Sequence, residues 1–194
     1  MFRQISCVLA FVAMAASSAA GQDPSIAARR DLVDLAGKRA DPFAATREEV
    51  LVFLFLRTDC PVANSYAPEI KRLWGRFKEK GVGFFIVYSD SDETPEMIRK
   101  HLGEYGYPMG ALSDPKRTFA ARSKVTVTPE AAIYRRDGTL LYHGRIDDRF
   151  VDFGKARSQP TVHDLSRALN QAVAGERVAA AGGPAIGCDI EGVR

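Results

Sequence analysis

The sequence lacks the excess of one charge that marks many binding proteins. Its 27 basic and 24 acidic residues leave a formal net charge of only +3, and they form no block of one sign. A balance this mild gives no electrostatic reason to expect nucleic acid or a membrane surface as a partner. No internal repeat is visible in the sequence either, so we expect one ordinary globular domain.

Hydrophobic runs long enough to span a membrane are also missing. Arg3 precedes an apolar stretch from Ile5 to Ala16, and four small residues follow at 17–20. This order is typical of a secretory signal peptide with its cleavage site, and we predict one at residues 1–20. Its apolar part is too short for a stable span, so we expect none in the mature chain. The mature protein, about 174 of the 194 residues, would be exported to a periplasm or outside the cell, and it is long enough for one good core.

Cysteine is scarce, with three residues in the whole chain. Cys7 falls in the predicted signal peptide, which leaves Cys60 and Cys188 in the mature protein. In an oxidising compartment an even count makes a disulfide the default expectation, and two cysteines allow one intrachain pairing. Cys188 follows an Ala, Gly and Pro stretch at 179–184 that has little to bury. Cys188 could therefore be one end of a static disulfide or a resolving thiol on a mobile arm.

Cys60 lies between a predicted buried strand and a predicted helix. Val50 to Leu56 is an unbroken apolar run, typical of a strand buried on both faces, and a helical pattern begins near Ser65. In open α/β sheets, chemistry tends to lie just beyond the carboxyl end of such a strand. The amino end of a helix favours the reactive thiolate through its unpaired N–H groups and its dipole. We therefore predict a reactive and accessible Cys60, with a buried structural thiol as the alternative.

The rest of the chain alternates between strand and helix patterns. A second apolar run from Val82 to Tyr88 follows the first helix, which indicates a right-handed parallel crossover. Another helix is expected after Thr94, and a hairpin from Ala131 to Ile146 turns at Asp137-Gly138, a pair that suits a type I′ turn. A last helix is expected near Thr161. This order predicts a mixed sheet with helices on both faces.

Three features in a fixed order carry a family resemblance. Cys60 follows the first core strand, Pro68 lies eight residues further on, and Val127-Thr128-Pro129 precedes the final hairpin. With these the chain resembles the thioredoxin-like superfamily, and within it the redoxin branch of alkyl hydroperoxide reductase and thiol-specific antioxidant (peroxiredoxin-like) proteins and exported reductases. The resemblance implies a three-layer α/β/α fold with a central mixed sheet at residues 29–175. A flexible tail at 176–194 would carry Cys188.

The same resemblance implies roles for particular residues. Cys60 takes the place of the first active-site cysteine, while Thr128 and a cis Pro129 would position the substrate beside it. The second cysteine of the family's Cys-x-x-Cys motif is replaced by Ala63, and the peroxidase pattern Thr-x-x-Cys is absent because Arg57 lies three residues before Cys60. Cys188 is therefore the predicted resolving partner, joined to Cys60 in a disulfide during the cycle.

These residues lead us to expect an exported thiol-dependent oxidoreductase that reduces disulfides or peroxides. Its partner would be a thiol or disulfide protein or a small peroxide, and the sequence does not identify the electron donor. One alternative is an antioxidant peroxidase of the peroxiredoxin type. Another is a copper-handling chaperone or a binding module without enzymatic activity, although Asn64 stands where copper chaperones of this fold have a second cysteine. We expect no cofactor and no metal site.

Three polar features have simple structural interpretations. His101 lies on a predicted helix and is expected to face solvent. The acidic loop at 90–93 is expected to be solvated and to cap that helix. The charge-dense stretch at 144–149 predicts either a salt-bridged strand end or a rim that holds the returning tail, through Arg145 or Arg149.

Overall fold

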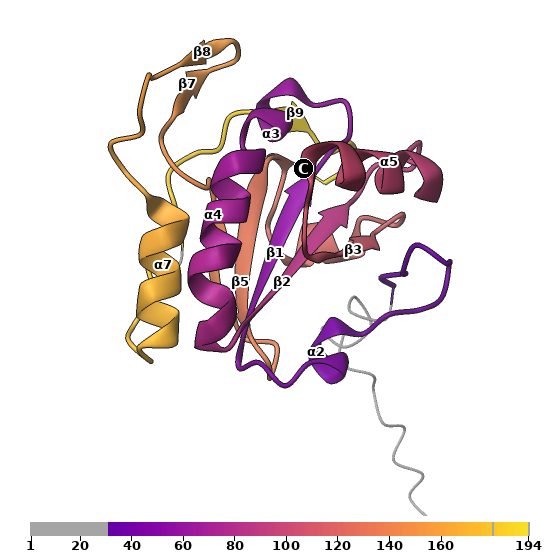
Figure 1. The fold of residues 1–194 in the computed structure, drawn as a ribbon, viewed down its shortest axis with the longest axis horizontal. Coiled ribbons are helices and arrows are strands. Elements are labelled where there is room, and N and C mark those ends of the chain that lie inside the picture. Colours follow the sequence, from indigo (N-terminus) through magenta and orange to yellow (C-terminus); the bar gives the residue numbers. More distant parts are fainter. Residues whose placement is uncertain (1–30, 180, 194) are drawn as a thin grey trace, which may run out of the picture.

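The structure is a computed structural model that describes residues 31–179 and 181–193. The predicted signal peptide at 1–20 lies outside the described residues. Within them, no helix combines the length and the apolar character that crossing a bilayer requires. A five-stranded sheet with the order β3-β2-β1-β5-β6 forms the centre of the fold (Figure 1).

Helices and strands are interspersed along the described chain. The helices are α2 (Pro42–Ala45), α3 (Pro61–Ser65), α4 (Ala67–Phe77), the 3-10 turn η1 (Lys78–Lys80), α5 (Pro95–Tyr105), α6 (Thr118–Arg122) and α7 (Asp164–Val173). The strands are β1 (Val50–Leu56), β2 (Val82–Tyr88), β3 (Gly110–Ser113), β4 (Val127–Thr128), β5 (Glu130–Arg135), β6 (Leu140–Gly144), β7 (Phe150–Asp152), β8 (Lys155–Ala156) and β9 (Cys188–Asp189).

The central strand β1 is buried on both faces, as its apolar run predicts. It pairs parallel with β2 and antiparallel with β5, so the sheet is mixed. Alternate β1 residues contribute to two separate cores. Val52 and Leu54 belong to the core that α4, α5 and α7 cover, and Phe53 and Phe55 belong to the core under α2 and α6. The predicted three-layer α/β/α fold with a central mixed sheet is confirmed.

The helix that follows Cys60 begins earlier than its sequence pattern indicates. α3 starts at Pro61 rather than near Ser65, ends at Ser65, and is separated from α4 by Tyr66. Pro68 lies in the first turn of α4, where its missing N–H leaves no helical hydrogen bond unmade. The break at Tyr66 therefore divides one apparent helix into a short segment at the thiol and a longer segment on the sheet.

The β5–β6 hairpin forms where it is predicted, but its turn is of another kind. A type I′ turn needs positive φ at both central residues. Gly138 has a φ of 93°, whereas Asp137 is not among the described residues with positive φ. The pairing also shifts register between Ile133 and Tyr134, where one step along β5 corresponds to two steps along β6, so Leu141 of β6 is the extra residue.

The last described segment lies against the domain rather than apart from it. β9 pairs antiparallel with β4, and Ile190 is 7% exposed within the core under α2 and α6. Figure 1 shows β9 at the end of the sheet where α3 begins. The composition at 179–184 indicates little to bury, but the anchoring residue comes six positions later. The division into a domain at 29–175 and a flexible tail at 176–194 remains a prediction.

Candidate active site

Cys60 sits at the junction of β1 and α3, as its sequence context predicts. It is the N-cap residue of α3, and its carbonyl accepts the first helical hydrogen bond from Asn64 N at 3.0 Å. The prediction of an accessible thiol is wrong for this structure, since Cys60 is 0% exposed. Its side chain also makes no capping hydrogen bond to the helix. The thiol instead contacts β4 and β9, through Thr128 and Cys188.

The two cysteines of the predicted mature chain meet in the structure. Both are free thiols, and their Sγ atoms lie 2.6 Å apart although 128 positions separate them. The Cys188 thiol donates to Cys60 Sγ, and the Cys60 thiol donates to the Thr128 carbonyl at 3.2 Å. The structure therefore places a pair of thiols at the end of the central strand, rather than one exposed thiol.

Thr128 and Pro129 lie beside this pair, where the resemblance places them. The bond between them is cis. The Thr128 hydroxyl donates to the Cys188 carbonyl at 3.4 Å, so Thr128 contacts both cysteines. Buried Glu130 accepts from Thr126 N at 2.9 Å and from Val127 N at 3.4 Å, which fixes the loop that leads into this bond. Burial is the main cause that raises the pKa of Glu130.

The loop before Cys60 is held on both backbone groups of Thr58. Its N–H donates to the Glu93 carboxylate at 2.6 Å, and its carbonyl accepts from the Asn64 side-chain amide at 3.0 Å. Glu93 is buried, so the prediction of a wholly solvated acidic loop at 90–93 is wrong for this residue. Burial is the main cause that raises its pKa above the usual range. The loop therefore presents Cys60 from a fixed position.

His101 continues this support into the core. The expectation that it faces solvent is wrong, because it is only 3% exposed. Its Nε2 lies 2.8 Å from Asn64 Oδ1 and its Nδ1 lies 2.7 Å from the Tyr88 hydroxyl. Burial lowers the pKa of His101. The burial of His101 could have been predicted from its spacing of three residues from Ile98, because residues at i and i+3 share a helix face.

The surroundings of the Cys188 thiol favour its protonated form. Burial, followed by the hydrogen bond to Cys60, raises the pKa of Cys188 to about 12, while the positive charge of Arg57 lowers it and Asp59 raises it. At neutral pH Cys188 therefore keeps its proton and donates it in a hydrogen bond to the other sulfur. A thiol becomes nucleophilic only as the thiolate, so this arrangement restrains Cys188 while it is covered.

The charge-dense stretch after β6 forms a salt-bridged strand end, the simpler of its two interpretations. Arg145 pairs with buried Asp164 at 2.6 Å. Asp148 accepts from the backbone N–H of Thr161 at 2.6 Å. The tail still packs here, because a Cβ on Gly183 would lie 2.5 Å from the guanidinium carbon of Arg145. This contact depends on a close approach of the backbone.

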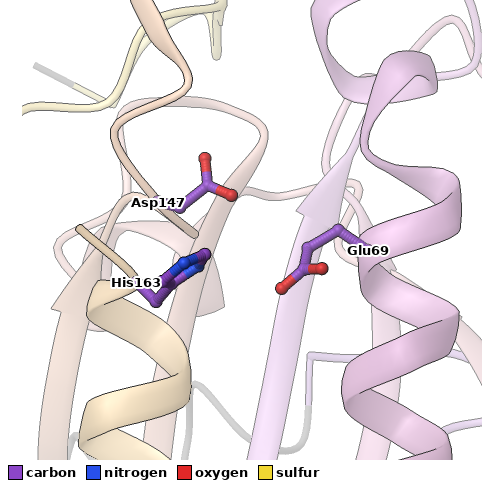
Figure 2. A group of neighbouring side chains, drawn as sticks. All are labelled: Glu69, Asp147 and His163. Atoms are coloured by element: carbon purple, nitrogen blue, oxygen red, sulfur yellow. The ribbon is translucent and has the colours of Figure 1, made fainter. Parts of the chain in front are cut away.

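A second polar cluster lies between α4 and α7. Figure 2 shows Glu69, Asp147 and His163 facing one another, and their donor atoms all lie within 4.8 Å of each other beside a cavity of about 570 Å³. These are ligand types that zinc accepts. Both Glu69 oxygens already accept from Arg72 at 2.6 Å, and Asp147 accepts from the Tyr66 hydroxyl at 2.6 Å. Glu69 is therefore already paired with the positive charge of Arg72.

The fold and the site together define a class of protein. A mixed sheet in three layers, with a cysteine at the end of its central strand and a cis X-Pro bond beside that cysteine, is the arrangement of the thioredoxin-like superfamily. The Redoxin family model matches residues 19–159, and the chain therefore belongs to the Redoxin family. This confirms the family resemblance found in the sequence.

Several solved structures share the fold. The chain is similar to a hypothetical protein from Sinorhizobium meliloti 1021, with 25% identity, a TM-score of 0.70, and coverage of 82% of this chain and 88% of the other. It is similar to an uncharacterized conserved protein from Geobacillus kaustophilus, with 24% identity, a TM-score of 0.68, and coverage of 82% of this chain and 86% of the other. It also resembles the thioredoxin domain of a thiol-disulfide oxidoreductase from Bacteroides vulgatus, with 16% identity, a TM-score of 0.52, and coverage of 73% of this chain and 90% of the other. No curated protein matches the chain.

Proposed function

We propose that this protein is a thiol-disulfide oxidoreductase in which Cys60 attacks a partner's disulfide and Cys188 resolves the product. The observation that supports this most directly is the 2.6 Å separation of the two sulfurs. Membership of the Redoxin family and the position of Cys60 at the end of β1 support the same chemistry. With Ala63 in the position of the usual second cysteine, Cys188 supplies the thiol that the local motif lacks.

The reaction balances with two thiols and one partner disulfide. The Cys60 thiolate attacks one sulfur of the partner, which forms a Cys60–partner disulfide and releases the other partner sulfur as a thiolate that takes up a proton. Cys188, deprotonated, then attacks Cys60 Sγ, which forms the Cys60–Cys188 disulfide and releases the second partner thiolate. The partner gains two electrons and two protons, and this chain becomes oxidised. An external thiol returns the disulfide to the dithiol state.

Cys60 is the better candidate for the first attack. It lies directly after the central strand at the start of α3, and it receives the hydrogen bond from Cys188. Thr128 and the cis Pro129 would position the partner beside it. Because Cys60 has no exposed surface in this structure and Cys188 of the tail lies against its sulfur, the tail must move before a partner reaches the sulfur.

A disulfide is favoured as substrate over a small peroxide or copper. Two-residue β4 offers backbone groups to an extended strand, and a peptide can use them whereas a small peroxide cannot. Copper handling has less support, because Asn64 is engaged by Thr58 and His101 at the position where a second copper ligand would stand. We propose that the partner is a disulfide-bearing protein in an oxidising compartment, in keeping with the expected export of the chain to a periplasm or outside the cell.

Reduction of insulin by a thiol reductant, measured by turbidity, tests this function. We expect Cys60→Ser to lose the catalysed rate entirely. Cys188→Ser should slow turnover and accumulate a covalent adduct between Cys60 and the substrate, which mass spectrometry would locate. Catalysis by Cys60→Ser at the wild-type rate would overturn the proposal.

A further inference from the structure

We propose that the tail at 187–190 occupies the strand edge at which a partner binds, and that partners carry a matching pattern of glycine, cysteine, an exposed residue and an aliphatic residue. This inference rests on the thiol-disulfide exchange proposed above. It names the substrate class of that site and makes the tail a competitor of the substrate. Three contacts of the tail define the pattern.

The tail is bound to β4 as a strand. Val127 pairs with Asp189 and Thr128 pairs with Cys188 in antiparallel register. Beyond this ladder, Ile190 N donates to the Thr126 carbonyl at 2.8 Å. These bonds use backbone groups, so any extended peptide could make them, and β4 has room for one such peptide on this edge. The ladder therefore sets the register of the cysteine but does not choose the sequence.

The position before the cysteine admits no side chain. A Cβ on Gly187 would lie 1.9 Å from the Thr128 carbonyl oxygen and 3.2 Å from Cδ of Pro129. Both contacts belong to the fixed loop beside Cys60 and not to a flexible side chain. Any residue other than glycine must move the strand away from β4, and with it the neighbouring cysteine. The edge itself thus selects glycine at this position.

The position two residues after the cysteine is anchored by an apolar side chain. Ile190 is 7% exposed and belongs to the core under α2 and α6, together with Val125 and Phe119. Burying a side chain of this kind is among the larger single gains available to a short peptide. Asp189, between the cysteine and this anchor, is exposed. The structure therefore distinguishes a buried aliphatic position from an exposed one.

Occupation by the tail and by a partner exclude each other. The same Thr128 groups contact Cys188, and Cys60 has no exposed surface while the tail is in place. A partner strand enters when the tail leaves, and its cysteine then takes the position of Cys188 beside Cys60. When the tail exchanges back onto β4, Cys188 attacks Cys60 Sγ and the partner's sulfur departs as a thiolate. Return of the tail is thus both the resolving step and the release of product.

The test uses full-length protein and defined peptides. The probe is the symmetric disulfide of Ala-Ile-Gly-Cys-Asp-Ile-Glu, the sequence of residues 185–191. Two further probes replace the glycine by valine or the second isoleucine by aspartate. Each is mixed with reduced Cys188→Ser protein, with and without the added substitution Gly187→Val that lifts the tail. The rate at which the Cys60–peptide disulfide forms is followed by mass spectrometry.

We expect the lifted-tail protein to trap the unmodified peptide at least about tenfold faster than Cys188→Ser alone. Both altered peptides should react with the lifted-tail protein about tenfold more slowly than the unmodified peptide, because one loses the buried side chain and the other loses the strand register. Adding Glu191→Gln to Cys188→Ser, a change at an exposed tail position, should leave the trapping rate unchanged. Equal rates for the three peptides would overturn the inference. Should Gly187→Val disturb folding, as thermal unfolding would reveal, Ile190→Asp lifts the tail by a different contact.

A small disulfide separates this inference from the function on which it rests. The lifted-tail protein is treated with 5,5′-dithiobis(2-nitrobenzoate), which has no peptide backbone to pair with β4. A Cys60 that reacts with this reagent but does not distinguish the peptides would remove the substrate pattern and leave the exchange chemistry standing. A Cys60 that reacts with neither would remove the proposed function as well.

Discussion

Cys60 and Cys188 touch each other, yet the regions that hold them differ in depth, connectivity and support. Cys60 follows a seven-residue strand that is wholly buried between β2 and β5, and Thr58 beside it is held by Glu93 and Asn64. Cys188 belongs to a two-residue strand that pairs with another two-residue strand, and Ile190 is the buried residue near it. One region is part of the scaffold, and the other is attached to it.

This difference is consistent with the complementary roles proposed for the two thiols. A region with many buried contacts opens only when the whole domain unfolds, whereas a region with few contacts opens locally at much lower cost. Cys60 can therefore keep its position through a reaction while Cys188 leaves and returns. Substitutions in the two regions should therefore differ in effect, and the largest loss of stability is expected in the scaffold.

Truncating the scaffold below Cys60 should cost the most stability. Leu54→Ala removes a fully buried β1 side chain, and we expect the free energy of unfolding to fall by about 3 kcal/mol. Val173→Ala, at a side chain that is 38% exposed on α7, should change it by less than about 0.5 kcal/mol. Urea unfolding measures both. Similar losses for the two variants would contradict the distinction between scaffold and surface.

Truncating the tail anchor should act mainly on local opening. Ile190→Ala weakens the attachment of the tail by about 2 kcal/mol, so we expect alkylation of Cys60 to become about 30-fold faster. Global unfolding should change less than in Leu54→Ala. The matched control Glu191→Gln should leave alkylation unchanged. If Ile190→Ala leaves Cys60 as protected as in the wild type, the tail is not what covers the sulfur.

Alkaline pH should weaken the reduced, covered state through Cys188. Burial raises the pKa of this thiol to about 12 from an ordinary value of 9.0. The folded state thus favours the neutral thiol, and this contribution to stability is complete below about pH 9 and is lost as the pH rises towards 12. We expect the free energy of unfolding to fall more steeply above pH 9 in the wild type than in Cys188→Ser. Parallel pH profiles would contradict this assignment.

The smallest expected effect concerns His101, in the support behind Cys60. Burial lowers its pKa, and the charge of Glu104 opposes this shift. A depressed folded pKa contributes stability above the unfolded value of about 6.5 that is lost as the pH falls. The wild type should therefore lose more stability between pH 7 and pH 5 than His101→Gln, which should itself cost about 1 kcal/mol at neutral pH. Equal acid sensitivity would place His101 outside the folded hydrogen-bond chain.

The sequence predicts the scaffold better than the attachments to it. The uninterrupted apolar run from Val50 to Leu56 can bury its side chains on both faces only between two layers, which predicts a central strand. The helix pattern that follows places Cys60 just beyond the end of this strand. The cis bond at Thr128-Pro129 was available through family resemblance. Thr128 and Pro129 remain predictions as substrate-positioning residues. These features depend on local patterns, which one sequence contains.

The burial of Cys60 could not be predicted, since it depends on a contact between distant short segments. β4 and β9 are two residues each, too short to show any alternation of apolar and polar residues, and their pairing brings Cys188 against Cys60. The cluster of Glu69, Asp147 and His163 likewise joins three elements that no sequence spacing relates. Such features arise from tertiary packing between distant segments, and no periodic pattern in a single sequence predicts them.

The most direct test of the dithiol account is a stoichiometric reaction of the reduced wild-type protein. One equivalent of a disulfide substrate is added, and both proteins are digested without reduction and mapped by mass spectrometry. We predict that the peptides of Cys60 and Cys188 become linked in a single chain while the substrate gains two thiols. Two free thiols in this chain after the substrate is consumed, or a disulfide that leaves either cysteine unpaired, would contradict the account.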